Sequence, residues 1–280
     1  MRTLFDLILV MVLTSIIAGC QSGSVGEVTF MPEDIAGDLE TFANAKIFFG
    51  HQSVGNNIID GLGILEKGVK TVDLTVADYE SHQADGNGCF LHTRVGKNRE
   101  PESKCLDFGR IIDQELNGKI DYALLKLCYV DITKDSDVAQ VFNDYRRTMD
   151  DLIARHPNIT FVHTTMPLKN NPSGLKIKIK ELLGRVHHQK LDNIKRNEFN
   201  NLLKTTYSDD PVIDIAESES TYPDGSREFF ISDGQTYYAL IPGYTYDGGH
   251  LNEQGQIQVA KTFVHEMAEI IRNKSNSAAE

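Results

Sequence analysis

Short apolar runs alternate with longer amphipathic stretches from about residue 46 onward. Five runs have the length and apolar content of buried strands, at residues 47–49, 69–76, 122–130, 159–164 and 212–215. Apolar residues recur at helical spacing in the segments 54–67, 106–116, 137–154, 190–207 and 253–272. Parallel strands need crossover connections that place helices outside the sheet, so this order predicts one α/β domain with a mainly parallel, five-stranded sheet.

Two segments interrupt this alternation. Residues 79–104 are polar and rich in glycine, and they form a stretch too long for a mere connection, so they are a candidate functional loop. Residues 227–240 place aromatic residues on both sides of Asp233-Gly234, which predicts an inserted β-hairpin.

The first twenty residues are predicted to be a targeting segment rather than part of the fold. Arg2 precedes an apolar run over residues 7–18, about half of the roughly 20 residues that cross a bilayer, which favours a secretory signal. The following Ile-Ala-Gly-Cys20 resembles the lipobox of bacterial lipoproteins. That resemblance implies cleavage before Cys20 and lipid attachment to it; the alternative is an ordinary signal peptide with a coincidental cysteine.

These patterns divide the chain into four parts. We expect a signal peptide at 1–19, a lipidated Cys20 and tether at 20–43, the α/β domain at 44–274, and a disordered tail at 275–280. Gln21, rather than an aspartate, follows Cys20, which favours the outer membrane over the inner one. The expected location is the bacterial cell envelope, with the lipid as membrane anchor and the domain facing the periplasm or the exterior; the oligomeric state stays open.

Charge and composition narrow the classes of partner. The chain has 28 Lys and Arg against 40 Asp and Glu, a net charge of −12, which argues against a nucleic-acid partner because phosphates need clustered positive charge. The adjacent His187 and His188, and His265-Glu266 without the second histidine of HExxH, do not indicate a metal site. We therefore expect no metal site.

An exported chain enters an oxidising compartment, so its cysteines are candidates for a disulfide. Cys89 and Cys105 both fall in polar, glycine-containing sequence, and a bridge between them is predicted. Cys128 lies in an apolar run and is predicted to be a buried thiol. The alternative is that all three are free thiols.

Ser53 is the first candidate for chemistry. It follows the apolar run 47–49 in Gly50-His51-Gln52-Ser53, where a helix is predicted to begin. A serine at a strand-to-helix turn presents its hydroxyl at the sheet edge, while its amide and the helix dipole favour negative charge nearby. The alternative is a serine that only caps the helix.

Asp247 and His250 are the second candidate, three residues apart in a glycine-rich turn before the last helix. Their side chains can meet on one side of this turn, where the aspartate would hold the imidazole in the tautomer that accepts a serine proton. The alternative is an aspartate that caps the helix beside an exposed histidine.

These residues together resemble the SGNH hydrolase superfamily, also called GDSL-type esterases. The sequence Asp-Gly-Gly-His-Leu-Asn-Glu-Gln-Gly at 247–255 is similar to the last conserved block of that family, and segments 197–200 and 212–214 are similar to the part upstream of it. The resemblance covers about residues 45–272 and implies a flavodoxin-like, three-layer α/β/α domain. It also implies a catalytic triad of Ser53, His250 and Asp247.

The activity implied by the resemblance is hydrolysis of O-acyl esters without a cofactor. Export suggests an acylated carbohydrate as substrate, such as an O-acetylated polysaccharide, although a small acylated molecule also fits. Two alternatives remain open: a non-catalytic glycan-binding lipoprotein on the same fold, and an O-acyltransferase that uses the same three residues.

The chain departs from the family pattern at two places. His51-Gln52 stands before Ser53 where the family has Gly-Asp, and Val130 stands where the family has an asparagine that donates to the oxyanion. Loss of one such donor typically costs about 10² to 10³ in rate. The expected oxyanion donors are the Ser53 amide, Gly96 and Asn98, with Gly86, Gly88, His51 and Gln52 as further candidates, and His51 also as a reserve base.

Overall fold

The computed structural model describes residues 32–81, 88–172 and 186–277, together with the single positions 174, 177, 179 and 183. Its centre is a sheet of six strands in the order β2-β3-β1-β4-β5-β6, and every neighbouring pair is parallel. The strands are β1 (Lys46–His51), β2 (Val76–Asp78), β3 (Cys89–Arg94), β4 (Tyr122–Leu125), β5 (Thr160–Thr164) and β6 (Val212–Ile213).

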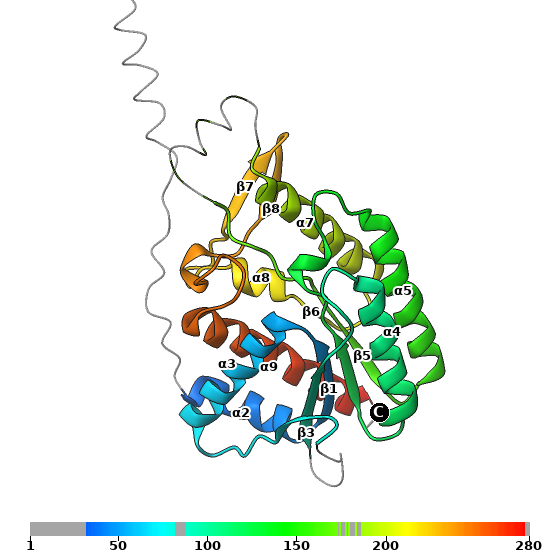
Figure 1. Ribbon diagram of the computed structural model, residues 1–280. Coiled ribbons are helices and arrows are strands. Elements are labelled where there is room, and N and C mark those ends of the chain that lie inside the picture. Colours follow the sequence, from blue (N-terminus) through cyan, green and yellow to red (C-terminus); the bar gives the residue numbers. More distant parts are fainter. Residues whose placement is uncertain are drawn as a thin grey trace, which may run out of the picture.

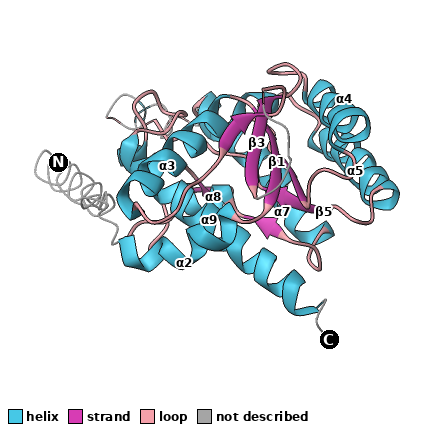
Figure 2. Ribbon diagram, turned by 90° about the horizontal axis from the view of Figure 1, so that it is seen from below, coloured by secondary structure: helices cyan, strands magenta, loops and turns pink. Residues whose placement is uncertain are grey.

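Helices cover both faces of this sheet, as Figures 1 and 2 show. One face carries α2 (Pro32–Ala43), α3 (Ser53–Val69), α8 (Ile215–Ser220) and α9 (Glu253–Ser277). The other carries α4 (Pro101–Ile111), which continues as a π-helical turn at Ile112–Leu116, with α5 (Val138–Arg155) and α7 (His188–Thr206). The expected α/β/α layering is therefore confirmed.

Strand β1 shows why the layers pack in this way. Its side chains alternate between the faces; five of its six residues are buried, and Ile47, Phe48 and Phe49 form its apolar run. Ile47 and Phe49 pack in the core beneath α3 and α9, whereas Phe48 packs in the core beneath α4 and α5. A strand buried on both sides needs this continuous apolar run rather than an alternating one.

The sheet has one strand more than the sequence predicts. Strand β3 lies inside the segment 79–104 that was expected to be a loop, and it pairs with both β1 and β2. Only its first three residues, Cys89 to Leu91, form an apolar buried run, and polar residues flank them on both sides. The strand predicted at 69–76 is wrong for most of its length, because α3 extends to Val69 and β2 begins only at Val76.

The described part of the expected tether, from residue 32 to 43, is helix α2 and belongs to the domain. Ile35, Leu39 and Phe42 lie on one face of this helix and are buried in the core. Arg272 of α9 forms an ion pair with Asp38 at 2.6 Å. Helix α9 reaches Ser277, three residues into the expected tail. The predicted signal peptide and Cys20 lie outside the described residues.

The predicted hairpin is confirmed, with β7 (Phe229–Ser232) antiparallel to β8 (Gln235–Tyr238). Asp233 and Gly234 at its tip have φ of 49° and 77°. Positive φ at both central residues is the requirement of the tight turn that suits the twist of a hairpin.

The predicted Cys89–Cys105 disulfide is wrong: both residues are free and buried, as is Cys128. Cys89 opens β3 at one edge of the sheet, whereas Cys105 lies in α4, which follows the opposite end of β3. A disulfide requires Cα atoms about 4.4–6.8 Å apart. Burial raises the pKa of the Cys105 thiol to about 12. None of the helices in the described ranges has the length and apolar content to cross a membrane.

Candidate active site

Ser53 is the first residue of α3 and lies at the carboxyl end of β1, where ligands bind in open α/β sheets. The preceding residue, Gln52, does not cap the helix with its side chain. Its amide nitrogen instead donates to the carbonyl oxygens of Val95 and Gly96, at 2.8 and 3.0 Å. Gln52 thus attaches the start of α3 to the loop after β3, and Ser53 is left half-buried at the helix N-terminus.

Asp247 and His250 are in direct contact, as their spacing predicts. His250 Nδ1 lies 2.6 Å from Asp247 Oδ2, and the amides of Gly249 and His250 donate to Oδ1 at 2.9 and 2.8 Å. Burial by itself would raise the pKa of Asp247, but the hydrogen bonds from His250 and Gly249 outweigh it and lower the pKa to about 2. An ionised Asp247 keeps the proton on Nδ1 and leaves Nε2 as an acceptor.

The turn after β4 lies between Ser53 and His250. Cys128 Sγ is 3.8 Å from Ser53 Oγ, and the next residue places Tyr129 Oη 3.4 Å from His250 Nε2. Within the described residues, the hydrogen-bond partner of Nε2 is therefore Tyr129 rather than Ser53. A hydrogen bond of 3.1 Å from the Leu251 amide to Asn57 Oδ1 ties the histidine turn to α3, one helical turn beyond Ser53.

A buried ion pair supports the turn after β4. Lys104 Nζ lies 2.6 Å from Asp131 Oδ2, and both side chains are fully buried. Asp131 also accepts from the Cys128 amide at 2.7 Å and from the Arg99 amide at 2.9 Å. This carboxylate therefore joins the loops after β3 and β4. Sequence reasoning assigned no role to Lys104, Tyr129 or Asp131; the last two flank Val130, the position where the family has its asparagine.

The expected oxyanion donors are placed less favourably. The Gly96 amide donates to Asp107 Oδ2 at 3.0 Å, so it is already engaged. Position 96 requires glycine, because its φ is 54° and a Cβ there would lie 2.5 Å from the backbone nitrogen of Lys104. Asn98 accepts from Lys104 Nζ at 3.1 Å. Gly88 lies at the opposite end of β3, and Gly86 is outside the described residues.

His51 is not placed to act as a base. It is fully buried, with Nδ1 2.9 Å from the Gln52 carbonyl oxygen and Nε2 3.3 Å from His92 Nδ1. Burial lowers its pKa to about 3, so it stays neutral near pH 7. Its ring lies directly beneath Gly55, where a Cβ would approach it to 2.3 Å.

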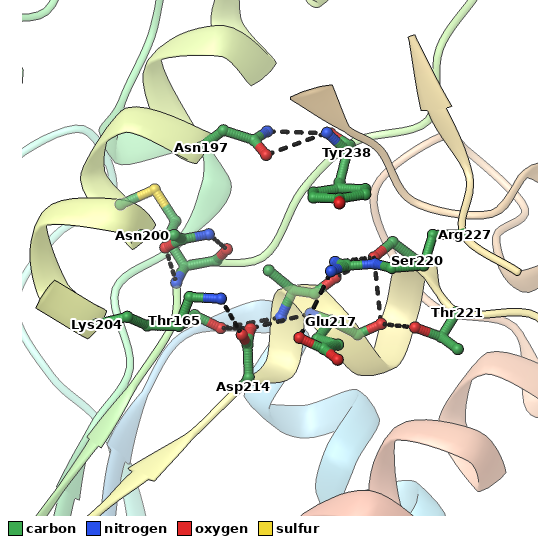
Figure 3. A network of polar contacts seen from close by, with 12 residues as sticks. Thr165, Asn197, Asn200, Lys204, Asp214, Glu217, Ser220, Thr221, Arg227 and Tyr238 are labelled. Carbon is green, nitrogen blue, oxygen red and sulfur yellow. Dashed lines mark hydrogen bonds and ion pairs between the residues drawn. The ribbon is translucent and has the colours of Figure 1, made fainter. Parts of the chain in front are cut away.

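The upstream segments that resemble the family are structural supports (Figure 3). Asn200 pairs with the backbone of Met166 through both atoms of its amide, at 2.7 and 2.9 Å. Asn197 pairs in the same way with the backbone of Tyr238, at 3.0 and 3.1 Å. Asp214 accepts from Thr165 Oγ1 and the Lys204 ammonium, at 2.8 and 2.7 Å. These contacts hold α7, α8 and the hairpin against the loop after β5.

Comparison with known proteins finds a distant likeness in solved structures alone. No protein-family model matches the chain, and no curated protein does. A Streptococcus pneumonia protein provisionally assigned as a platelet activating factor has a TM-score of 0.45 and 16% identity, over 83% of this chain and 90% of that one. A protein of Desulfitobacterium hafniense DCB-2 provisionally assigned to the G-D-S-L family of lipolytic proteins has a TM-score of 0.44 and 10% identity, over 80% and 99%.

A third solved structure similar to the chain is the periplasmic domain of a lipopolysaccharide acetyltransferase from Salmonella ser. Paratyphi A. Its TM-score is 0.40 and its identity 12%, over 89% of this chain and 92% of that one. Because these TM-scores and sequence identities are low, the chemistry of the site is inferred from its own residues.

Proposed function

We propose that the protein is a serine ester hydrolase whose triad is Ser53, His250 and Asp247. The observation that carries the proposal is the 2.6 Å contact between His250 Nδ1 and Asp247 Oδ2, on a turn that is bound to α3 beside Ser53. In the reaction, Ser53 attacks the ester carbonyl while His250 Nε2 takes its proton and later returns it to the leaving alcohol. Asp247 orients His250 and stabilises the imidazolium.

This mechanism requires a small change at the serine. Proton transfer needs Ser53 Oγ within about 2.6–3.2 Å of Nε2, a distance that often forms only when substrate binds. Ser53 Oγ therefore moves away from Cys128 Sγ. His250 Nε2 gives up its contact with Tyr129 Oη and accepts a hydrogen bond from Ser53 Oγ instead. Rotation of the half-buried Ser53 side chain about χ1 is the change that this step requires.

Stabilisation of the oxyanion is proposed to come from two donors. The first is the Ser53 amide, which gains from the N-terminal end of the α3 dipole. The second is Tyr129 Oη, which lies beside His250 and next in sequence to Val130, where the family has its asparagine. Burial raises the pKa of Tyr129 to about 12, so the phenol keeps its proton at neutral pH.

The proposed substrate is an O-acyl, most simply O-acetyl, ester on a carbohydrate of the bacterial envelope. This assignment rests on the family resemblance and on the predicted lipoprotein signal. We also propose that Cys20 carries the lipid. Replacement of Cys20 by serine is expected to release the protein from membranes, and continued membrane retention would contradict lipid attachment as the main anchor.

Hydrolysis of 4-nitrophenyl acetate by the purified full-length protein tests the serine. Ser53→Ala is expected to lower kcat by at least about 10², because the nucleophile is lost. Ser275→Ala, an exposed serine on the last turns of α9, is the matched control and is expected to behave as wild type. Equal activity of wild type and Ser53→Ala, or no activity of wild type on a panel of acetyl esters, would refute the proposal.

A second candidate is a glycan-binding protein with a degenerate site. It is favoured by Val130, by the engaged Gly96 amide and by the contact of His250 with Tyr129 rather than Ser53. Glycan binding without ester turnover would support it. An O-acyltransferase would instead transfer acetyl groups to an added glycan faster than to water.

A further inference from the structure

A pocket of about 460 Å³ lies beside the candidate triad, on the other side of Tyr129. It is formed at the carboxyl edge of the sheet by the loops that follow β3, β4 and β5 and by the first turns of α7. Its lining residues are Arg99, Tyr129, Val130, Thr133, Lys134, Asp135, Lys169, His188, Asp192 and Arg196.

The pocket is positively charged, although the whole chain has a net charge of −12. Its two carboxylates already have cationic partners: Asp135 with Lys134 at 2.6 Å, and Asp192 with Arg196 at 3.8 Å. The remaining cations, Arg99 and Lys169, form no ion pair with a carboxylate of the described residues. Two positive charges of the pocket are thus left uncompensated.

The base of the pocket is rigid. Arg196 is 2% exposed and donates from Nε to the Tyr129 carbonyl oxygen at 2.8 Å and from Nη1 to Asn193 Oδ1 at 2.8 Å. Burial lowers its pKa to about 10, which still leaves it charged at neutral pH. Lys169 Nζ lies 5.3 Å from the centre of the Tyr129 ring. The Arg196 guanidinium carbon lies 5.9 Å from the centre of the same ring, so these two cations are arranged around one aromatic side chain.

Tyr129 connects this pocket to the chemistry. Its ring borders the pocket, and its hydroxyl lies 3.4 Å from His250 Nε2. The ring is also held from the other side, because a Cβ at Gly249 would come within 2.8 Å of Tyr129 Cζ. A group bound between Arg99 and Lys169 is therefore about one tyrosine side chain away from an ester at Ser53.

We propose that this pocket binds an anionic group of the substrate, so that the protein acts on acyl esters of acidic sugars, carrying a carboxylate or a sulfate. The proposal rests on the proposed esterase function. An oxyanion between a guanidinium and an ammonium gains charge-assisted hydrogen bonds, which are stronger than neutral ones. Binding at a position remote from the ester orients the reacting carbonyl against Ser53.

Binding to the catalytically silenced full-length Ser53→Ala protein tests the pocket without reference to turnover. Calorimetry compares trigalacturonate, a sulfated galactose trisaccharide and neutral galactotriose. We expect at least one anionic trisaccharide to bind tenfold or more tightly than galactotriose, and the tighter of the two identifies carboxylate or sulfate. Equal binding of all three, or binding of none, would overturn the proposal.

Charge-removing variants locate the binding. In the same background, Lys169→Met, which keeps the apolar stem beside Tyr129, and Arg99→Ala are each expected to weaken binding of the anionic trisaccharide at least tenfold. Lys97→Ala is the matched control, because Lys97 lies in the same loop and pairs with Glu100 at 4.0 Å outside the pocket. An equal loss in the Lys97 variant would show a non-specific charge effect and overturn the assignment.

Turnover separates this proposal from the esterase proposal. In the otherwise wild-type protein, Lys169→Met is expected to raise KM for acetylated trigalacturonate or its sulfated counterpart at least tenfold more than it raises KM for 4-nitrophenyl acetate. Lys97→Ala, outside the pocket, is expected to leave both values unchanged. Selective anion binding by a protein that hydrolyses no ester would refute the esterase and support the pocket. Ester hydrolysis with no preference for acidic substrates, and no effect of Lys169→Met, would refute the pocket and support the esterase.

Discussion

Tyr129 Oη lies 3.4 Å from His250 Nε2, the nitrogen that accepts the Ser53 proton in the proposed mechanism. The other ring nitrogen of His250 is held by Asp247 at 2.6 Å. The imidazole is thus oriented at both ends before substrate arrives, by a residue of the last turn before α9 and by a residue of the turn after β4. This arrangement gives Tyr129 a definite role to test.

Tyr129→Phe removes the hydroxyl and keeps the ring. We expect kcat to fall by about 10² to 10³, the usual cost of an oxyanion donor, with little change in KM. The control is Tyr246→Phe: the Tyr246 ring stacks on the His250 ring, at 6.2 Å between ring centres, but Tyr246 is 69% exposed. A rise in kcat of Tyr129→Phe would mean that the hydroxyl obstructs His250, and would contradict the proposed role.

Asp247→Asn tests the orientation of the imidazole. The amide retains the shape of the side chain but favours the wrong tautomer and does not stabilise the imidazolium, so kcat is expected to fall by up to about 10⁴. Asp60→Asn, an exposed aspartate on α3, is the control. A loss below about threefold in initial-rate measurements would mean that Asp247 only shapes the turn.

The Lys104–Asp131 ion pair is expected to stabilise the site loops as well as the fold. Asp131→Ala leaves a buried ammonium unpaired and is expected to destabilise the protein by about 3–5 kcal/mol. Lys104→Met is expected to cost less, because Asp131 keeps the amides of Cys128 and Arg99 as donors. Urea unfolding measures both, with the exposed Lys97→Met as control, and the reverse order of the two effects would contradict this account.

Glu219 is expected to make stability fall as the pH rises. It is fully buried, accepts from the Leu168 amide through Oε1, and has no partner for Oε2 among the described residues. Burial raises its pKa to about 8 from a usual 4.5. The unfolded chain then releases this proton first, so the protonated group favours the folded state below about pH 4.5, and that contribution is lost as the pH rises toward 8.

Glu219→Gln measures this contribution. The amide oxygen still accepts from Leu168, but the group no longer titrates. Between pH 4.5 and 8, the unfolding free energy of wild type is expected to fall relative to that of Glu219→Gln. The size of this fall is a few kcal/mol, as expected from the shift in the pKa of Glu219. Glu40→Gln, at an exposed position of α2, is expected to show no such change. Parallel stability curves of Glu219→Gln and wild type would show that the carboxyl is not buried as described.

The free cysteines give a further test of the fold. Cys89, Cys105 and Cys128 are all expected to react with iodoacetamide after unfolding without reductant, and dithiothreitol is expected to leave Tm unchanged. Mass spectrometry of the peptides reads out the labelling. Peptides joined through Cys89 and Cys105 would restore the predicted disulfide and contradict the arrangement of β3 and α4.

Prediction from the sequence worked where the information is local. The helices follow from apolar residues three and four positions apart, which lie on one face of a helix whatever it packs against. The contact of Asp247 with His250 is also local, because a glycine-rich turn brings residues three apart together. Ser53 at a strand-to-helix junction follows in the same way from the order of elements.

Prediction failed where contacts are between distant segments. Strand β3 has only three apolar residues, and its pairing with β1 and β2, rather than its own pattern, makes it a strand. The predicted disulfide placed Cys89 and Cys105 in one loop, but that strand separates them. The sequence suggested the Gly96 amide as an oxyanion donor. In the structure this amide donates a hydrogen bond to Asp107, eleven residues later.

The sequence by itself determined the α/β class, the tight turn of the hairpin and the local pairing of Asp247 with His250. These depend on periodicity and on backbone preferences within a few residues. Only the tertiary structure decided what lies between Ser53 and His250, and that Arg99, Lys169 and Arg196 line one pocket with Tyr129. Those residues come from three connections of the sheet, and only the parallel order of its strands, which collects their carboxyl ends at one edge, brings them together.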